Sequence, residues 1–437
     1  MNYLMTITVA VLAFSLSANA QTNDPLLNQQ YYIGAHNIDQ VWNTTKGSSN
    51  TRIAIHSSTG FLNNHDDMGG SRFLSQFTNW FIPEKGFAQE VAGIIGANTN
   101  NGIGMAGINW NATMRSYNFL DVDLSSGVDQ NYVFNADNVD YHFSVSNMNA
   151  MLDQAVQDNM DVQVFTFGVP IASKYKLWEF NNGNPSLSNY KLLTEGPSIP
   201  TPQEAFWNEI QNAMVSMGTN IWNSITGNSF IPPTDLTLFR NKLWNAATQH
   251  NYSLIAAVGD KIDGRSPAPM LMPLAFDDFV IGVGGGELTG SQNRIYWTGA
   301  GTSPYIDLVA AASNISTLSG SSFNSYNSSF SSTQASAAIA AGVVSLLKKQ
   351  NSTLSYDDLE HILKNTAIDI GLQGKDDETG YGWLNAKAAL DYITYNDIVR
   401  ETVPQNEIQV TYQNELSGTY GLENTYREYG YYGSSIH

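Results

Sequence analysis

The sequence predicts an α/β protein with a doubly wound, mainly parallel sheet and helices on both faces. Short β-branched or apolar segments alternate with segments of helical periodicity through most of the chain, as in strand-helix-strand units. Residues 335–349 begin with small side chains and continue as an amphipathic pattern, which indicates a helix packed closely against its neighbours. These observations favour one large α/β domain.

The predicted elements follow one another in chain order. Residues 52–58 form a strand that ends at a Thr-Gly turn, and residues 87–95 form a short helix followed by an Asn- and Gly-rich loop at 98–104. Two further helix and strand pairs are predicted, with helices at 146–159 and 239–250 and strands at 162–167 and 253–258.

Two segments depart from this alternation. Pro, Asn and Trp residues recur through the segment from about residue 169 to 235. This segment is too long for a simple loop, so we predict an insertion. After about Tyr395 the apolar periodicity fades, and residues 395–437 form a tail rich in Tyr and Gly. The predicted organisation is a domain over residues 21–394 with one insertion, followed by this tail.

The first twenty residues predict export. An apolar run at 4–16 precedes Ala18-Asn19-Ala20, a small-residue cleavage site, so residues 1–20 are expected to be a secretory signal peptide. An uncleaved anchor is the alternative, because no Lys or Arg precedes the apolar run. No later segment has the apolar length of a membrane span, so we expect none after cleavage and a secreted, extracellular or periplasmic location.

The composition limits the classes of binding partner and the interactions that can stabilise the fold. The chain has 39 acidic and 20 basic residues and a net charge of -19, which disfavours a nucleic-acid partner. It has no cysteine, so disulfides and thiolate metal sites are excluded, and packing or hard cations must stabilise the exported protein. This combination is typical of a bacterial exoprotein.

Several blocks, in the right order and spacing, resemble the subtilisin-like serine peptidases, the subtilases, over residues 24–390. GFAQEVAG at 86–93 lies where that family has GHGTHVAG, and STQASAAIAAG at 332–342 lies where it has GTSMATPHVAG. GYGWLNA at 380–386 is similar to its closing GYGRVNA, and residues 53–68 resemble the strand that bears its aspartate. The resemblance implies a subtilisin-like fold.

The resemblance also locates the catalytic positions of the family. Its chemistry needs a serine nucleophile, a histidine base, a carboxylate that orients the histidine, and donors for the oxyanion. Carried over, the aspartate position is Ser58, the histidine position is Phe87 and the serine position is Gln334. The oxyanion asparagine falls on Asp260, whose charge would repel an oxyanion. We therefore expect a subtilase scaffold without peptidase activity.

Three functions remain open at this point. The first is a secreted, inactive homologue that binds an unidentified protein or peptide or acts by assembly. The second is an active secreted serine endopeptidase with a relocated site, in which His56 would serve Ser57, Ser332 or Thr333, although we expect His56 to be a buried or hydrogen-bonded strand residue. The third is a structural surface component that self-assembles through the tail.

The resemblance further implies a structural calcium site in the Asn- and Gly-rich loop. Its ligands would be the Asp67 carboxylate, the Asn101 side chain and the carbonyl oxygens of Thr99, Ile103 and Met105. Such oxygen ligands suit Ca²⁺. An ordinary Asn-Gly turn is the alternative.

The insertion follows the strand that lines the specificity pocket in subtilases. Val169-Pro170 comes first, and a proline there removes a backbone donor that a bound peptide strand could use. We therefore expect the insertion to narrow or cap the old substrate groove. The alternative is an appendage with a small core of its own or an exposed partner-binding patch.

Overall fold

The structure is a computed structural model that describes residues 22–57, 60–74, 87–118, 120–123, 133–136, 139–143, 145–166, 233–261, 279–290, 293–303 and 305–395. The predicted signal peptide, Ser58, the insertion up to residue 232 and the tail beyond Tyr395 lie outside these residues. The expected capping of the groove by the insertion is therefore outside the described part as well.

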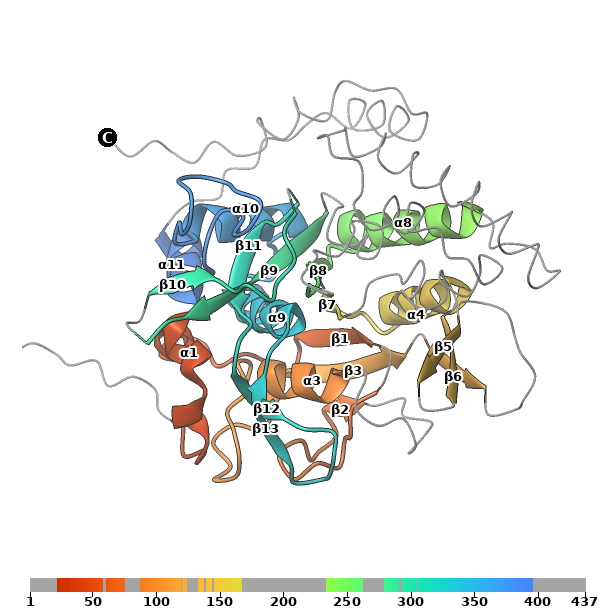
Figure 1. Cartoon of the computed structure of the whole chain (residues 1–437), viewed down its shortest axis with the longest axis horizontal. Coiled ribbons are helices and arrows are strands. Elements are labelled where there is room, and N and C mark those ends of the chain that lie inside the picture. The colour runs from red at the N-terminus through yellow and green to blue at the C-terminus, as the bar shows by residue number, and fades with distance from the viewer. Residues whose placement is uncertain are drawn as a thin grey trace, which may run out of the picture.

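An eight-stranded sheet forms the centre of the molecule (Figure 1). The strand order is β10-β9-β8-β7-β1-β3-β2, and β11 also pairs with β9. All pairs are parallel except that of β9 and β10, which confirms the predicted mainly parallel sheet. The strands are β1 (Arg52–Ser57), β2 (Phe73–Leu74), β3 (Thr113–Asn118), β7 (Val162–Phe165), β8 (Ser253–Ala257), β9 (Val280–Leu288), β10 (Arg294–Tyr296) and β11 (Leu308–Ala311).

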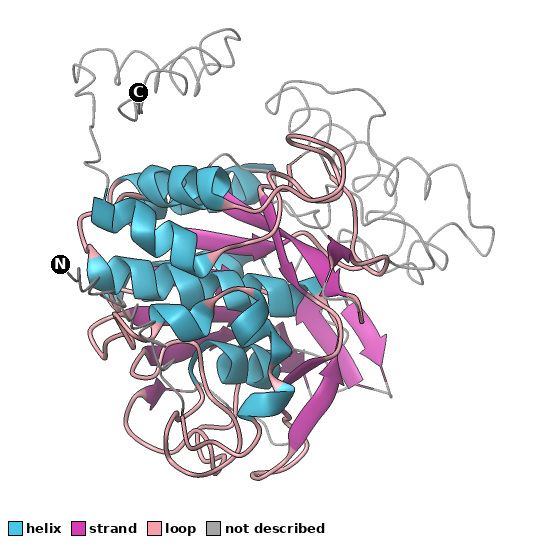
Figure 2. Ribbon diagram, turned by 90° about the vertical axis from the view of Figure 1, so that its left-hand side faces the viewer, coloured by secondary structure: helices cyan, strands magenta, loops and turns pink. Residues whose placement is uncertain are grey.

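Helices cover the sheet, and Figure 2 shows them stacked alongside its strands. They are η1 (Leu27–Gln29), α1 (Tyr31–Ala35), α2 (Ile38–Val41), α3 (Ala88–Gly96), α4 (Val145–Gln157), α8 (Pro233–Thr248), α9 (Thr333–Gln350), α10 (Tyr356–Thr366) and α11 (Ala386–Tyr395). Two small antiparallel sheets complete the described fold: the hairpin β12 (Ile315–Leu318) with β13 (Tyr326–Phe330), and the sheet of β4 (Leu120–Asp123), β5 (Val133–Ala136) and β6 (Val139–Phe143). Among the residues the structure describes, no helix combines the length and apolar character required to cross a membrane.

The side chains of β1 alternate between the two faces of the sheet. Ile53 and Ile55 of β1 belong to the main core, which also contains the apolar residues of α3 and α9. Ala54 points to the opposite face, because side chains alternate along a strand. There it packs with Tyr117 of β3 and Ala155 of α4 in a separate small cluster. Helices therefore pack on both faces, as predicted.

Helix α9 shows why a small-residue sequence folds as it does. Its N-terminus is capped by Ser332, whose side-chain oxygen accepts a hydrogen bond from the backbone N–H of Gln334. Nearly all of its residues are buried, and a Cβ added at Gly342 would lie 2.8 Å from the side chain of Ile108. Only a residue without a side chain allows this approach, which confirms the predicted close packing.

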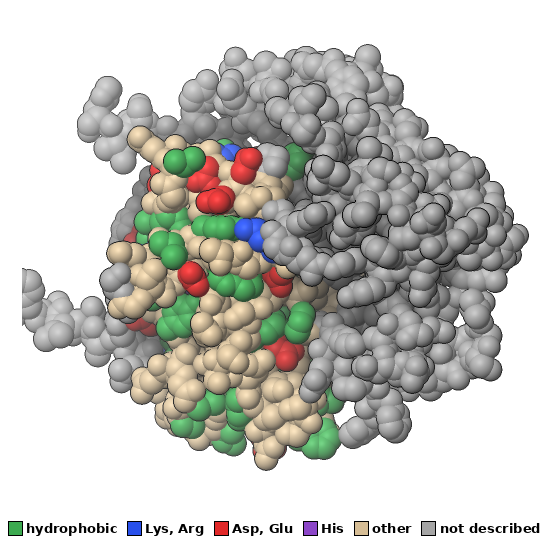
Figure 3. All heavy atoms as spheres, viewed as in Figure 1, with side chains coloured by type: hydrophobic (Ala, Val, Ile, Leu, Met, Phe, Trp, Pro, Cys, Tyr) green, Lys and Arg blue, Asp and Glu red, His purple; other side chains and the backbone are tan. Residues whose placement is uncertain are grey.

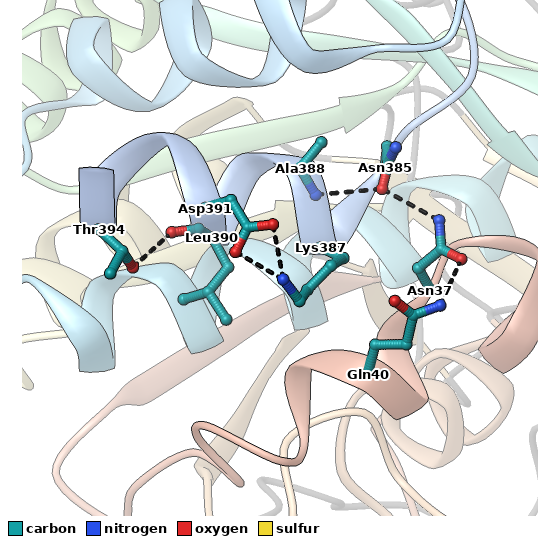
Figure 4. Close-up of polar contacts among 8 residues, drawn as sticks. All are labelled: Asn37, Gln40, Asn385, Lys387, Ala388, Leu390, Asp391 and Thr394. Carbon is teal, nitrogen blue, oxygen red and sulfur yellow. Dashed lines mark hydrogen bonds and ion pairs between the residues drawn. The ribbon is translucent and has the colours of Figure 1, made fainter. Parts of the chain in front are cut away.

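The amino- and carboxyl-terminal ends of the domain are joined by side-chain amides (Figure 4). Asn385 accepts hydrogen bonds through its Oδ1 from the backbone N–H of Ala388 and from Nδ2 of Asn37, while Gln40 donates to Oδ1 of Asn37. Asn385 belongs to the GYGWLNA block, so that block begins α11 and fixes it to α2. Lys387 and Asp391 form an ion pair one turn apart along α11.

The predicted elements agree with the structure to within two residues at each end, apart from one boundary. Helix α8 begins at Pro233, whereas the pattern predicted a start at residue 239 and placed residues 233–235 in the insertion. Proline is well suited to the first turn of a helix, because its missing N–H would have no partner there. The apolar periodicity becomes regular only after this turn, so the start was predicted too late.

Candidate functional site

The described catalytic positions converge where the parallel strands end. β1 ends at Ser57, directly before Ser58, and β8 ends three residues before Asp260. The carboxyl ends of parallel strands lie at one edge of a sheet, where α/β proteins place their sites. Asp260 contacts Thr333, the first residue of α9, so the start of α9 lies at this edge too.

Phe87 occupies the predicted base position at the N-terminus of α3. Its ring is half-buried and packs against Phe330 of β13, with 5.1 Å between ring centroids and 49° between ring planes. Its backbone lies in the left-handed region, at φ 50°, which costs a non-glycine residue roughly 1–2 kcal/mol. An aromatic hydrocarbon ring accepts no proton, so this position supplies packing and no base.

Gln334 occupies the predicted nucleophile position in the first turn of α9. Its backbone N–H donates to the Ser332 side chain at 3.1 Å. Its side-chain Oε1 is buried and accepts no hydrogen bond from the described residues. A carboxamide is no nucleophile, because its nitrogen lone pair is delocalised into the carbonyl.

Asp260 is bound to the N-terminus of α9. Its Oδ1 accepts hydrogen bonds from the backbone N–H and from the hydroxyl of Thr333, at 2.7 and 2.8 Å. Burial raises the pKa of Asp260, and the hydrogen bonds from Ser332 and Thr333 oppose that rise. A carboxylate is favoured at a helix N-terminus. Together, Asp260 and Ser332 accept the N–H groups of residues 333 and 334 that could otherwise face an oxyanion.

His56 is buried in the sheet, as predicted for a strand histidine, and is only 3% exposed. Its ring stacks on Phe165 of β7, with centroids 4.5 Å apart, and on Tyr117 of β3, with centroids 5.3 Å apart. Its Nε2 lies 2.9 Å from Oε1 of Gln163. Burial lowers the pKa of His56 to about 4, against the opposing effect of the Gln163 hydrogen bond.

The three hydroxyls proposed for a relocated site are also buried. Ser57, Ser332 and Thr333 are each at most 1% exposed. The Ser332 oxygen caps α9, and the Thr333 hydroxyl accepts the backbone N–H of Gly259 at 3.1 Å while donating to Asp260. The described structure does not bring the ring of His56 into a hydrogen bond with Ser332 or Thr333.

The loop after α3 brings three of the predicted calcium residues into direct contact. The fully buried Asp67 carboxylate accepts Nδ2 of Asn101 at 2.9 Å and the backbone N–H of Met105 at 2.8 Å. Burial raises the pKa of Asp67 to about 7, and the nearby Asp24 carboxylate adds to this rise. The Asn101 Oδ1 accepts the backbone N–H of Ile103, so coordination by this oxygen would require the amide to turn.

Backbone carbonyls of the same loop remain open. In the described part of the chain, no hydrogen bond ends on the carbonyl oxygens of Thr99, Ile103 or Met105, whereas the Gly104 carbonyl accepts the N–H of Leu26 at 2.7 Å. This alternation fits oxygen coordination of a hard cation. Calcium binding stays a prediction, in which Asp67, Asn101 and these three carbonyls would hold the ion.

Glycine is required at the centre of this loop. Gly104 has φ 53°, and a Cβ built there would lie 2.1 Å from the Tyr326 hydroxyl and 2.4 Å from Oδ2 of Asp67. The sequence reasoning missed Asp24, whose carboxylate accepts the backbone N–H groups of Asn100 and Asn101 at 2.8 and 3.2 Å. No local pattern indicates a contact between residues 76 positions apart.

Figure 3 shows one face of the described surface, on which acidic side chains lie among polar and apolar ones, several of them close together near the top, and Lys or Arg side chains appear at few places. This distribution agrees with the net charge of -19.

Two solved structures share this fold. Fervidolysin from Fervidobacterium pennivorans, a keratinolytic enzyme related to subtilisin, superposes with a TM-score of 0.53 at 17% identity, over 86% of this chain and 47% of that chain. A lanthipeptide protease superposes with a TM-score of 0.51 at 16% identity, over 84% of this chain and 95% of that chain. At such low identity the likeness shows the fold alone.

Sequence comparisons agree. The Neisserial autotransporter lipoprotein NalP of Neisseria meningitidis serogroup B is 34% identical over 90 residues, which are 20% of this chain and 8% of NalP. The match thus spans less than a tenth of that relative. The model of the subtilase family matches residues 84–382, well over half of the 437 residues. The chain therefore belongs to the subtilase family.

Proposed function

We propose that this chain is an exported subtilase without peptidase activity, which acts by binding a protein or peptide or by assembly. The observation that carries the proposal is the chemistry of Phe87 and Gln334 at the base and nucleophile positions. Neither side chain can take up a proton from a nucleophile or attack a carbonyl carbon. In subtilisin, removing the corresponding serine or histidine lowers kcat by roughly 10⁶-fold.

The hydrogen bonds of the oxyanion region support the same proposal. Asp260 and Ser332 accept the first two N–H groups of α9, at 2.7 and 3.1 Å. A negative charge developing on a substrate oxygen would meet a carboxylate where the family has an amide donor. Loss of a single oxyanion donor costs about 10²–10³-fold in kcat, so this change removes residual catalysis that does not depend on the triad.

The relocated peptidase is the rival proposal, and the burial of its candidate groups weighs against it. Catalysis would require His56 to leave its place between Phe165 and Tyr117 and to exchange its Gln163 partner for a hydroxyl. Ser332 and Thr333 would also have to give up their roles at the start of α9.

Export is the second part of the proposal. It is supported by the signal-peptide pattern of residues 1–20 and by the absence of cysteine. The partial similarity to NalP, an autotransporter lipoprotein, also favours a location outside the cytoplasm.

An activity assay on the purified full-length mature protein tests the proposal. We expect no hydrolysis of casein or of a mixed peptide library above the buffer control, and no labelling by a fluorophosphonate probe. The Gln334→Ala variant provides the matched control and should behave identically. Hydrolysis that survives purification and persists in Gln334→Ala would refute the proposal in favour of a relocated site.

A further inference from the structure

We propose that Asn101 is a site of spontaneous deamidation that adds a third carboxylate to the loop around Asp67. Asn101 is exposed and is followed by Gly102. In an Asn-Gly pair, the glycine backbone nitrogen attacks the side-chain amide carbon, a new C–N bond forms and ammonia leaves. Water then opens the resulting succinimide to aspartate or isoaspartate, so water is the only co-reactant.

Gly102 is not packed against other groups on the side where a side chain would project. A Cβ built on Gly102 would meet only Nδ2 of Asn23, at 3.8 Å, so the backbone can turn here without a steric clash on that side. Glycine also gives the backbone the freedom to turn its nitrogen toward the amide carbon. Within the described ranges, Asn101 is the one asparagine that precedes a glycine.

Hydrogen bonds restrain the reacting groups in the closed loop. The Gly102 N–H donates to Oδ1 of Asn23 at 2.8 Å, which occupies the attacking nitrogen. The Asn101 amide is held on both sides, by Oδ1 of Asp67 and by the N–H of Ile103, each at 2.9 Å. Reaction therefore requires these bonds to open, and whatever keeps the loop closed slows deamidation. A cation coordinated by the Asn101 Oδ1, as predicted for this loop, would replace these bonds and hold the amide in place, so it would slow deamidation too.

The product changes the charge of the loop. Replacing Nδ2 of Asn101 by oxygen places a carboxylate in the position that now lies 2.9 Å from Oδ1 of Asp67. Asp24 is also close, since its Oδ1 accepts the Asn101 backbone N–H at 3.2 Å. Three clustered carboxylates repel one another without a cation and bind calcium more tightly when it is present. Deamidation would therefore make the loop more dependent on calcium.

Peptide mapping by mass spectrometry tests the first step. Full-length mature protein is incubated in mildly alkaline buffer at growth temperature, with either calcium or EGTA. We expect Asn101 to convert before any other asparagine of the described ranges, and faster in EGTA. The Asn101→Gln variant, whose longer side chain does not close the five-membered ring, should stay unmodified. An intact Asn101 at a time when Asn182-Gly183, the other such pair in the sequence, has converted would overturn the proposal.

Melting curves of Asn101→Asp test the consequence. In EGTA this variant should melt below wild type, and its half-saturating calcium concentration should be about tenfold lower, because ligand charge tunes calcium affinity. Asn111→Asp, the same charge change at another exposed loop position, is the matched control. Equal behaviour of the two variants would refute the charge effect. If neither variant nor wild type responds to calcium, the calcium prediction fails, while the mapping experiment still decides the deamidation.

Discussion

Substitution of His56 by glutamine should flatten the pH dependence of stability. His56 is buried between Phe165 and Tyr117, and its Nε2–H donates a hydrogen bond to Oε1 of Gln163. Burial lowers its pKa to about 4, against about 6.5 in an unfolded chain. The unfolded state therefore binds a proton between these values while the folded state does not. The contribution of the neutral His56 to the free energy of unfolding is fully present above pH 6.5, and it is lost as the pH falls toward 4.

The magnitude follows from this difference in proton binding. Between pH 7.5 and pH 5, protonation of the unfolded histidine lowers the free energy of unfolding by about 2 kcal/mol, and the folded state recovers almost none of it. The full loss, reached near pH 4, is about 3 kcal/mol. His36 acts in the same direction, since burial lowers its pKa to about 3, but it is present in both proteins and cancels in their difference.

Urea unfolding of wild type and His56→Gln at a series of pH values measures the effect, with calcium held at one saturating concentration. The variant should be less stable at pH 7.5, because it loses the stacked ring, but the gap should narrow by about 2 kcal/mol at pH 5. Ile55→Val, on the other face of β1, is the matched control and should lose about 1 kcal/mol at every pH. Parallel curves for wild type and His56→Gln would refute the reasoning.

Further predictions concern the catalytic and calcium positions. The triple variant Ser58→Asp, Phe87→His, Gln334→Ser should hydrolyse casein only weakly, and adding Asp260→Asn should raise the rate; robust activity in the triple variant alone would contradict the role of Asp260. Asp260→Ala should lower the free energy of unfolding by about 1–2 kcal/mol in urea, since α9 loses an N-terminal acceptor. EGTA should lower the Tm of wild type but leave the Tm of Asp67→Ala unchanged, because calcium at 100 times its Kd adds about 2.7 kcal/mol to the free energy of unfolding. Identical wild-type melting curves with and without EGTA would contradict the calcium site.

Local sequence patterns were sufficient to predict the sheet, while the replacement of the catalytic positions stays a prediction from the family resemblance. The Phe87 and Gln334 positions could be located because Val91-Ala92-Gly93 and Ala341-Gly342 fix both blocks against the family pattern. The contacts that these residues make could not be predicted in the same way. Phe87 meets Phe330 only because the β12–β13 hairpin packs beside α3.

Polar contacts between distant residues were the least predictable feature. Asp260 and Thr333 are 73 positions apart, and Asp24 and Asn100 are 76 apart. A carboxylate accepts any N–H that the fold brings near it, and periodicity carries no information about which one that is. The sequence therefore indicated that Asp260 cannot donate a hydrogen bond to an oxyanion, but not that it accepts the first N–H of α9.

The residues predicted to lie at the catalytic positions contribute to the stability of the fold. Active sites commonly keep groups that destabilise the folded state because the chemistry needs them. Here Phe87 packs its ring on Phe330, and Asp260 gives α9 an acceptor for its first N–H. The left-handed backbone of Phe87 is a source of strain, and the contact of its ring with Phe330 offsets part of it. A histidine at position 87 would place a more polar ring on Phe330 and keep the left-handed backbone, whereas an asparagine at position 260 could still accept the Thr333 N–H through its amide oxygen. Of the two changes, the one at position 87 should therefore cost the fold more stability.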